Sequence, residues 1–152
     1  MSPEKAYRII AFDGLCNLCN STVNWVIDND AQQQFKFIAL QHIDRLQGLG
    51  IDLKEFPSIQ NLASADLVEN DHLHAWQSVY LIQDGQLYEK STAVLKICQQ
   101  LSGLYPLLYL YIIIPRPLRD LVYDVIAKNR YKWFGKRKAC RIPTPELKNR
   151  FL

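Results

Sequence analysis

The sequence is poor in cysteine, has no long apolar run and begins without the pattern of a secretory leader. Its four cysteines in 152 residues are too few for the disulfide framework of small secreted domains. Residues 104–114, the most apolar stretch, reach about half of the ~20 residues that a membrane-spanning helix needs. Residues 1–7 are polar and lack the apolar core of a signal peptide. We therefore expect a cytoplasmic protein whose cysteines perform chemistry, and a buried helix over 104–114.

Composition and charge narrow the possible partners. Apolar residues make up 49% of the chain, as in globular proteins. Three tyrosines within 104–114 keep peripheral contact with a membrane open, because tyrosine favours the membrane–water interface. Residues 128–152 hold nine Lys or Arg and one Glu, whereas residues 1–127 hold nine basic and fourteen acidic residues. Such a tail can bind nucleic acid or anionic lipid, but we expect a solvated face that pairs with the acidic body, and no nucleic-acid partner.

The first forty residues predict a strand–helix–strand unit. Residues 7–12 and 35–40 have the composition of strands, and Asp13-Gly14 marks a turn after the first of them. After Cys19, apolar residues recur at helical spacing, at Val23, Val26 and Ile27. A βαβ unit of this kind crosses over right-handed, so that its two strands run parallel.

The middle of the chain predicts a short helix at about 43–49, followed by a hairpin and a longer helix. Asp84-Gly85 lies between the strand-like segments 78–82 and 86–89 and is a strong signal for a two-residue hairpin turn. Ser91 is expected to cap the helix that follows. This order predicts an α/β, thioredoxin-like fold: βαβ…ββα, with a mixed four-stranded sheet flanked by helices.

The last third predicts a C-terminal helical extension. Residues 104–114 and 118–134 have helical patterns, separated by Pro115 and Pro117, which interrupt a helix. We expect a single domain over 1–152, with a core of about 5–102 and the extension over about 103–152. The second helix carries an apolar stripe that is expected to pack on the domain, made of Leu118, Leu121, Val122, Val125 and Ile126.

A C-x-x-C motif, Cys16 to Cys19, lies where the first strand gives way to the first helix. At a helix N-terminus, unpaired backbone N–H groups and the helix dipole favour a thiolate, so Cys16 is the expected nucleophile. Cys19 leads the apolar helix face, where we expect it to be more buried and to have the higher pKa of a resolving thiol. Cys16 would attack a substrate disulfide, and Cys19 would then attack Cys16 and release the substrate thiol.

Asp13, three residues before Cys16, has two interpretations. It is a candidate acceptor for the Cys19 proton if it is partly buried. Alternatively, it is the N-cap that holds the start of the helix. The sequence leaves both open, and both can hold together.

Other interpretations of the motif are weaker. A zinc site needs two more ligands, and Cys98 and Cys140 are isolated, while His72 and His74 have nothing to place them near Cys16. Cys98 is expected in the core. The strand that ends in Phe-Asp-Gly resembles the opening of haloacid dehalogenase-like phosphatases, but Ala11 occupies the position of their aspartate nucleophile. We expect no metal and no cofactor.

The pattern D-x-x-C-x-x-C, here Asp13, Cys16 and Cys19, resembles the DCC family of predicted thiol–disulfide oxidoreductases. The resemblance covers nearly the whole chain and continues at later segments, which are Ser91-Thr92-Ala93, Ile114-Pro115, Leu118-Arg119-Asp120, Val122-Tyr123-Asp124, Asn129-Arg130-Tyr131 and Phe134-Gly135. It implies a thioredoxin-like fold and a redox role. It does not carry over a substrate or a partner.

Two features depart from thioredoxin. Residues 75–77, Ala-Trp-Gln, lack the proline that thioredoxins place before the third strand, which weakens the case for peptide-like substrates; Trp76 could line the groove instead. Arg130, Tyr131 and Cys140 would lie near Cys16 if the extension folds back, and a basic group there would lower the pKa of Cys16. We expect surface packing instead.

The sequence thus predicts a thiol–disulfide oxidoreductase that acts on disulfides of proteins or small molecules, together with an unidentified redox partner. The main alternative is a non-catalytic thioredoxin-like module, binding or metal-holding, that uses the basic tail, and a further alternative is a small redox sensor. Oligomeric state and the direction of electron flow do not follow from the sequence.

Overall fold

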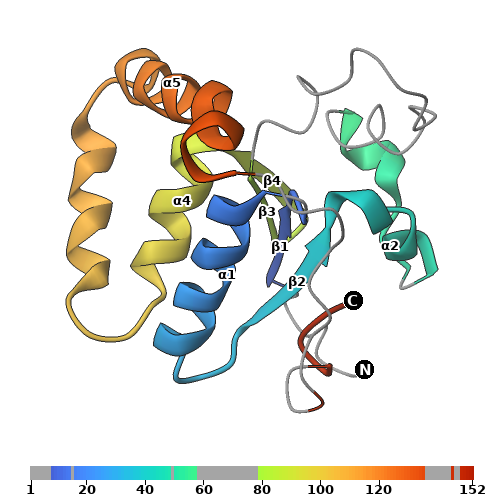
Figure 1. Ribbon diagram of the computed structural model, residues 1–152. Helices are drawn as coiled ribbons and strands as arrows, with labels where there is room; N and C mark the ends of the chain where they lie inside the picture. The colour runs from blue at the N-terminus through green and yellow to red at the C-terminus, as the bar shows by residue number, and fades with distance from the viewer. Residues whose placement is uncertain (1–7, 15, 49, 58–78, 136–144, 146–147) are drawn as a thin grey trace.

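The computed structural model describes residues 8–14, 16–48, 50–57, 79–135, 145 and 148–152 (Figure 1). At its centre is a four-stranded mixed sheet in the order β2-β1-β3-β4. β1 (Arg8–Phe12) pairs in parallel with β2 (Phe35–Ala39) and antiparallel with β3 (Tyr80–Gln83). β3 in turn pairs antiparallel with β4 (Gln86–Glu89). The predicted α/β fold, a mixed four-stranded sheet flanked by helices as in thioredoxin, is confirmed.

Helices cover both faces of the sheet (Figure 1). α1 (Asn17–Asn29) and α4 (Lys90–Gln99) lie on one face, where they pack on Ile10 and Phe12 of β1. The alternate β1 residue Ile9 faces the other core, on the side of the short α2 (Arg45–Gly48). Since side chains alternate along a strand, a strand buried on both faces is apolar throughout, which explains the unbroken run Ile-Ile-Ala-Phe.

The connections agree with the predicted turns. Asp84 and Gly85 have φ values of 52° and 73°, as a two-residue hairpin turn requires at both central positions. The short helix predicted at about 43–49 is present as α2 (Arg45–Gly48), with the 3-10 turn η1 (Leu40–His42) before it and the 3-10 turn η2 (Leu53–Glu55) after it.

Ser91 does not cap α4, so that prediction is wrong. The helix begins at Lys90, and its N-cap Glu89 makes no side-chain capping bond. The Ser91 hydroxyl instead donates to the Asp120 carboxylate and accepts from Arg119. A charged carboxylate is a stronger hydrogen-bond acceptor than a neutral group, and the second helix of the C-terminal extension places the Asp120 carboxylate beside Ser91.

The C-terminal extension consists of the 3-10 helix η4 (Tyr105–Ile113), which runs beside α4, and α5 (Arg116–Phe134), which crosses the ends of α1 and α4 (Figure 1). The prediction that 104–114 is buried is wrong: η4 has no buried residue, and Leu104 and Ile113 are each 80% exposed. No helix within the described ranges is both long and apolar enough to cross a membrane.

The predicted packing of the α5 stripe is also wrong. Leu118, Leu121, Val122, Val125 and Ile126 are all exposed. α5 turns its opposite side toward the body, with Ala127 and Arg130 buried. That side carries the polar partners of body residues: Asp120 for Ser91, Tyr123 for the Val79 amide and Arg130 for Asp13. These contacts fix the rotation of the helix.

The end of the chain is attached to the outer edge of the sheet. The Phe37 amide of β2 donates to the Arg150 carbonyl at 2.7 Å, and the Leu152 amide donates to the Phe37 carbonyl at 2.8 Å. The Arg150 guanidinium is buried against Asp30, the C-cap of α1, at 2.5 Å. An edge strand that is paired in this way is protected from further pairing.

Substitution of Arg150 tests this attachment. Arg150→Met would leave the buried Asp30 carboxylate without its cation, which we expect to lower the free energy of unfolding by about 3–5 kcal/mol. Lys148→Met, at an exposed position two residues away, should change it by less than about 0.5 kcal/mol. Urea unfolding measures both, and equal midpoints for the two variants would contradict a stabilising role for the pair.

Candidate active site

Cys16 is the N-cap of α1. Its backbone is extended (φ −83°, ψ 123°), and its sulfur accepts from the backbone N–H of Cys19 at a distance of 3.4 Å. An N-cap side chain reaches the N–H of the third helical residue, so the C-x-x-C spacing places Cys19 where the cap bond ends. The alternative in which Asp13 is the N-cap is therefore wrong.

Backbone and amide hydrogen bonds hold the turn before α1. The Cys16 amide donates to the Asp13 carbonyl at 3.3 Å. The buried Asn20 side chain donates to the carbonyls of Gly14 and Cys16 at 2.8 and 2.9 Å. Asn20 was not predicted as a site residue. A polar residue one turn into an otherwise apolar helix face is the signal that the sequence offers for it.

Asp13 is completely buried and forms an ion pair with Arg130 of α5, with 3.0 Å between Oδ2 and Nη2. The expectation that Arg130 packs on the surface is wrong: only 3% of the residue is exposed. A buried carboxylate must be paired or neutralised, and Arg130, 117 positions along the chain, supplies the charge. An aspartate directly after a buried strand is the signal in the sequence that a cationic partner is needed nearby.

The surroundings of Cys16 stabilise its thiolate. Hydrogen bonding from the Cys19 side chain lowers the pKa of Cys16 to about 6, with help from the Cys19 backbone N–H and the positive charge of Arg130. Burial of the sulfur and the Asp13 charge oppose this shift. Near neutral pH, Cys16 is therefore largely the thiolate, which is the nucleophilic form.

The same contact acts in the opposite direction on Cys19. Its hydrogen bond to Cys16, burial and the adjacent thiolate charge all raise the pKa of Cys19. The pKa values thus differ in the direction that the sequence predicts. The expected order of exposure is wrong, because Cys16 has no exposed surface and Cys19 is half-buried. Cys16 serves as the cap, and that role places its sulfur inside the turn.

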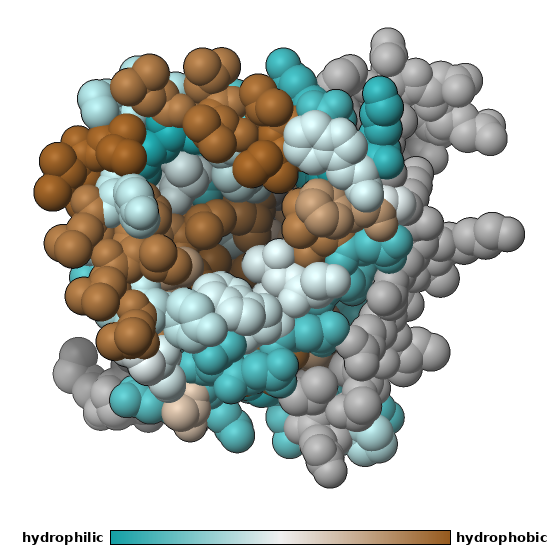
Figure 2. Space-filling view, turned by 60° about the vertical axis from the view of Figure 1, so that its left-hand side comes forward, coloured by the Kyte–Doolittle hydropathy of each residue, from teal (hydrophilic) through white to brown (hydrophobic). Residues whose placement is uncertain are grey.

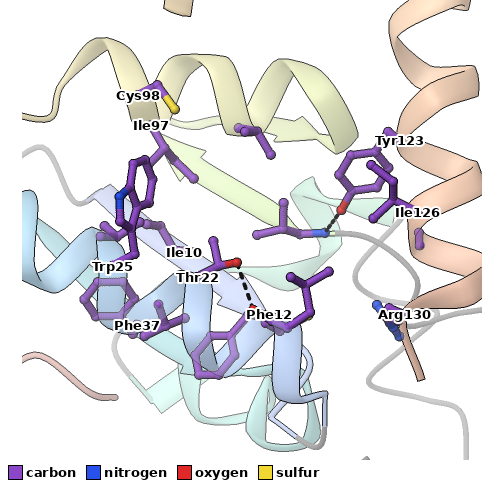
Figure 3. A pocket seen from close by; sticks show the side chains of 17 residues that line it. Ile10, Phe12, Thr22, Trp25, Phe37, Ile97, Cys98, Tyr123, Ile126 and Arg130 are labelled. Carbon is purple, nitrogen blue, oxygen red and sulfur yellow. Dashed lines mark hydrogen bonds between the residues drawn. The ribbon is translucent and has the colours of Figure 1, made fainter. Parts of the chain in front are cut away.

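A cavity of about 130 Å³ opens beside Cys19, between α1, α4 and α5 (Figure 3). Its wall is almost entirely apolar, with Arg130 and Tyr123 contributed by α5. The Tyr123 hydroxyl accepts from the Val79 amide at 2.8 Å, and burial raises the pKa of Tyr123 to about 12. Cys98 also lines the cavity, where burial raises its pKa. It is buried, as predicted.

The end of α5 lies on the first turn of α1. The Asn17 amide donates to the Gly135 carbonyl at 3.4 Å, and the Asn17 side chain donates to the Phe134 carbonyl at 2.9 Å. Gly135 has a φ of +83°, and a Cβ there would come within 3.0 Å of the Asn17 side-chain nitrogen. Glycine at 135 therefore permits this close approach.

Several predicted features lie outside the described residues: His72, His74, Trp76, the segment 75–77 and Cys140. The same holds for the side chain of Tyr131. Across the part of the chain that is described, no three His, Cys, Asp or Glu side chains gather in a group that could hold a metal ion.

Comparison with known proteins identifies the family to which the chain belongs. Residues 10–136 match the family described as DCC1-like thiol-disulfide oxidoreductase. The chain is 39% identical over 145 residues to the uncharacterized protein YuxK of Bacillus subtilis, covering 95% of this chain and 93% of that protein. It is 34% identical over 140 residues to a chloroplastic DCC family protein of Arabidopsis thaliana, covering 91% and 72% respectively. No solved structure matches the chain.

The charge of Arg130 can be tested through the pKa of Cys16. Arg130→Met should move the pKa of Cys16 upward from about 6, because the thiolate loses a nearby cation. Lys128→Met removes an equal charge at an exposed position and should leave it unchanged. The measurement is the pH at which Cys16 alkylation, followed by mass spectrometry, is half-maximal.

A double variant separates charge from folding. In Asp13→Asn/Arg130→Met both partners of the buried pair are neutral, so neither raises nor lowers the pKa of Cys16. Its midpoint should lie closer to that of the wild type than the midpoint of Arg130→Met does. If Arg130→Met folds and alkylates with the wild-type midpoint, the electrostatic role of Arg130 is refuted.

Proposed function

The chain belongs to the DCC1-like thiol-disulfide oxidoreductase family, and we propose that it catalyses thiol–disulfide exchange through Cys16 and Cys19. The observation that carries this proposal is the geometry of the helix start, where the Cys16 sulfur is the N-cap of α1 and accepts from the Cys19 backbone N–H at 3.4 Å. This arrangement lowers the pKa of Cys16 to about 6 and raises that of Cys19. A dithiol used in exchange needs one ionised nucleophile and one thiol that stays protonated until its turn.

In the first proposed step, the Cys16 thiolate attacks one sulfur of a substrate disulfide. The substrate S–S bond breaks, its second sulfur leaves as a thiolate, and Cys16 is joined to the substrate by a mixed disulfide. Negative charge then leaves Cys16, so the interaction that raised the pKa of Cys19 is lost. Cys19 thereby becomes easier to deprotonate at the stage when it must react.

In the second step, Cys19 gives up its proton and attacks the Cys16 sulfur. The mixed disulfide breaks, the second substrate thiolate leaves, and a Cys16–Cys19 disulfide forms; two electrons have passed to the substrate. We assign proton acceptance to Asp13, the buried carboxylate whose charge acts on both thiols. An external dithiol reductant would return the pair to its reduced form.

Access to Cys16 requires movement, since its sulfur has no exposed surface. The end of α5 is the segment whose carbonyls accept from Asn17, one residue beyond Cys16. We propose that this segment covers Cys16 and that a substrate displaces it.

As the location of this reaction we propose the cytoplasm, where thiols are kept reduced.

The proposal is tested by trapping. Cys19→Ser cannot complete the second step, so it should accumulate a mixed disulfide on Cys16 when given hydroxyethyl disulfide or glutathione disulfide. Cys16→Ser should form none. Cys98→Ala, which removes a buried cysteine outside the motif, should turn over like the wild type. Mass spectrometry identifies the adduct, and a folded Cys19→Ser protein without one would overturn the proposal.

The role of Asp13 is tested by Asp13→Asn/Arg130→Met, which removes the carboxylate without leaving Arg130 as an unpaired buried charge. Release of substrate thiol from the mixed disulfide should slow by about a hundredfold, the usual effect of losing a positioned base. Formation of the mixed disulfide, compared at equal Cys16 thiolate content, should keep its rate. Resolution at the wild-type rate would show that another group takes the Cys19 proton.

A further inference from the structure

The exposed apolar side chains are concentrated in one part of the chain. Every large hydrophobic residue that is exposed within the described ranges lies between 104 and 134, on η4, on its two cap residues or on α5. Leu104 and Ile113 are 80% exposed, Leu110 64% and Leu121 62%. We refer to the exposed apolar side chains of residues 104–134 as the apolar face. Figure 2 shows it as a brown surface around a hollow. A contiguous surface of this kind marks an interaction site.

Polar contacts of α5 with the body keep this face outward. Asp124 pairs with Lys90 at 3.2 Å, Arg130 pairs with Asp13, and Asp120 bonds to Ser91. These contacts occupy the inner side of α5, so the apolar stripe cannot turn inward without breaking them. Exposure of the stripe is therefore a stable property of the fold.

The charges at the apolar face are basic. The two acidic residues of α5, Asp120 and Asp124, are held by contacts to the N-terminal part of α4. Lys128 and Lys132, by contrast, are exposed. A basic border on an apolar surface complements an anionic lipid headgroup layer.

Two aromatic residues with polar groups lie in the same face. Tyr111 and Trp133 are each 56% exposed, and both residue types favour the membrane–water interface, where the ring meets lipid and the polar atom meets water. The positive charges of the exposed Lys128 and Lys132 favour an anionic surface over a second copy of the chain as the occupant of this face.

We propose that the apolar face docks on the surface of an anionic lipid bilayer. The side chains of η4 and the outer side of α5 would enter the headgroup boundary, with Lys128 and Lys132 against lipid phosphates. Ile126 belongs both to this face and to the wall of the cavity beside Cys19. Docking would therefore turn the cavity toward the bilayer.

Flotation of the full chain with lipid vesicles tests the proposal. We expect the wild type to float with vesicles of phosphatidylcholine and phosphatidylglycerol, less with phosphatidylcholine alone, and less at high salt. Leu121→Glu/Val125→Glu should weaken binding to the vesicles by at least roughly tenfold, since two carboxylates oppose insertion and repel anionic lipid. Lys128→Glu/Lys132→Glu should lose the preference for phosphatidylglycerol.

The matched control is Gln32→Glu/Gln47→Glu, which adds the same charge at exposed positions outside the apolar face and should float like the wild type. The proposal is overturned if the wild type does not float with anionic vesicles, or if Leu121→Glu/Val125→Glu floats as well as the control does. It is also overturned if sedimentation shows a wild-type dimer that this variant dissociates while vesicles bind neither. All of the changed positions are exposed, and circular dichroism checks the fold.

Discussion

The buried ion pair between Asp13 and Arg130 is the interaction on which the site depends. It joins the residue after β1 to a helix 117 positions later in the chain, across the first turn of α1. Each partner alone would be a charge without solvent, which is strongly unfavourable. The pair therefore locks α5 in place, and in doing so it brings a cation close enough to lower the pKa of Cys16.

Helix capping explains why two cysteines at this spacing behave so differently. Cys16 takes the cap position, where its sulfur accepts hydrogen bonds, and Cys19 takes the third helical position, from which its N–H and thiol face that sulfur. One contact accordingly stabilises negative charge on the first sulfur and disfavours it on the second. Asn20 then fixes the turn by occupying the carbonyls of Gly14 and Cys16. The asymmetry is a property of the helix start, whereas Arg130 lowers the pKa of both thiols.

The sequence predicted the parts of the fold that local patterns determine. The strand composition of β1, the helical spacing after Cys19 and the Asp84-Gly85 turn each depend on neighbours within a few residues, and the sheet assembled from them as expected. Prediction from the sequence failed where a side chain's interaction partner is distant along the chain. Nothing within reach of Ser91 or Arg130 in the sequence indicates Asp120 or Asp13, so capping and surface packing were the natural local interpretations. Both were wrong for the same reason, because Ser91 and Arg130 each bind a charged side chain from another segment of the chain.

The packing of α5 extends this point, because hydrophobicity alone predicted the wrong side. A helix has two opposite sides, and residues spaced by three or four share one of them. Asp120, Tyr123, Ala127 and Arg130 follow that spacing and face the body; a stripe that begins at Leu118 must then face away. Burying the stripe would have been favourable by area, yet it would have left the Asp13 carboxylate unpaired in the core. The polar contacts of Asp120, Tyr123 and Arg130 with the body together hold the other side of α5 inward, and the apolar face is the structural consequence of completing the active site.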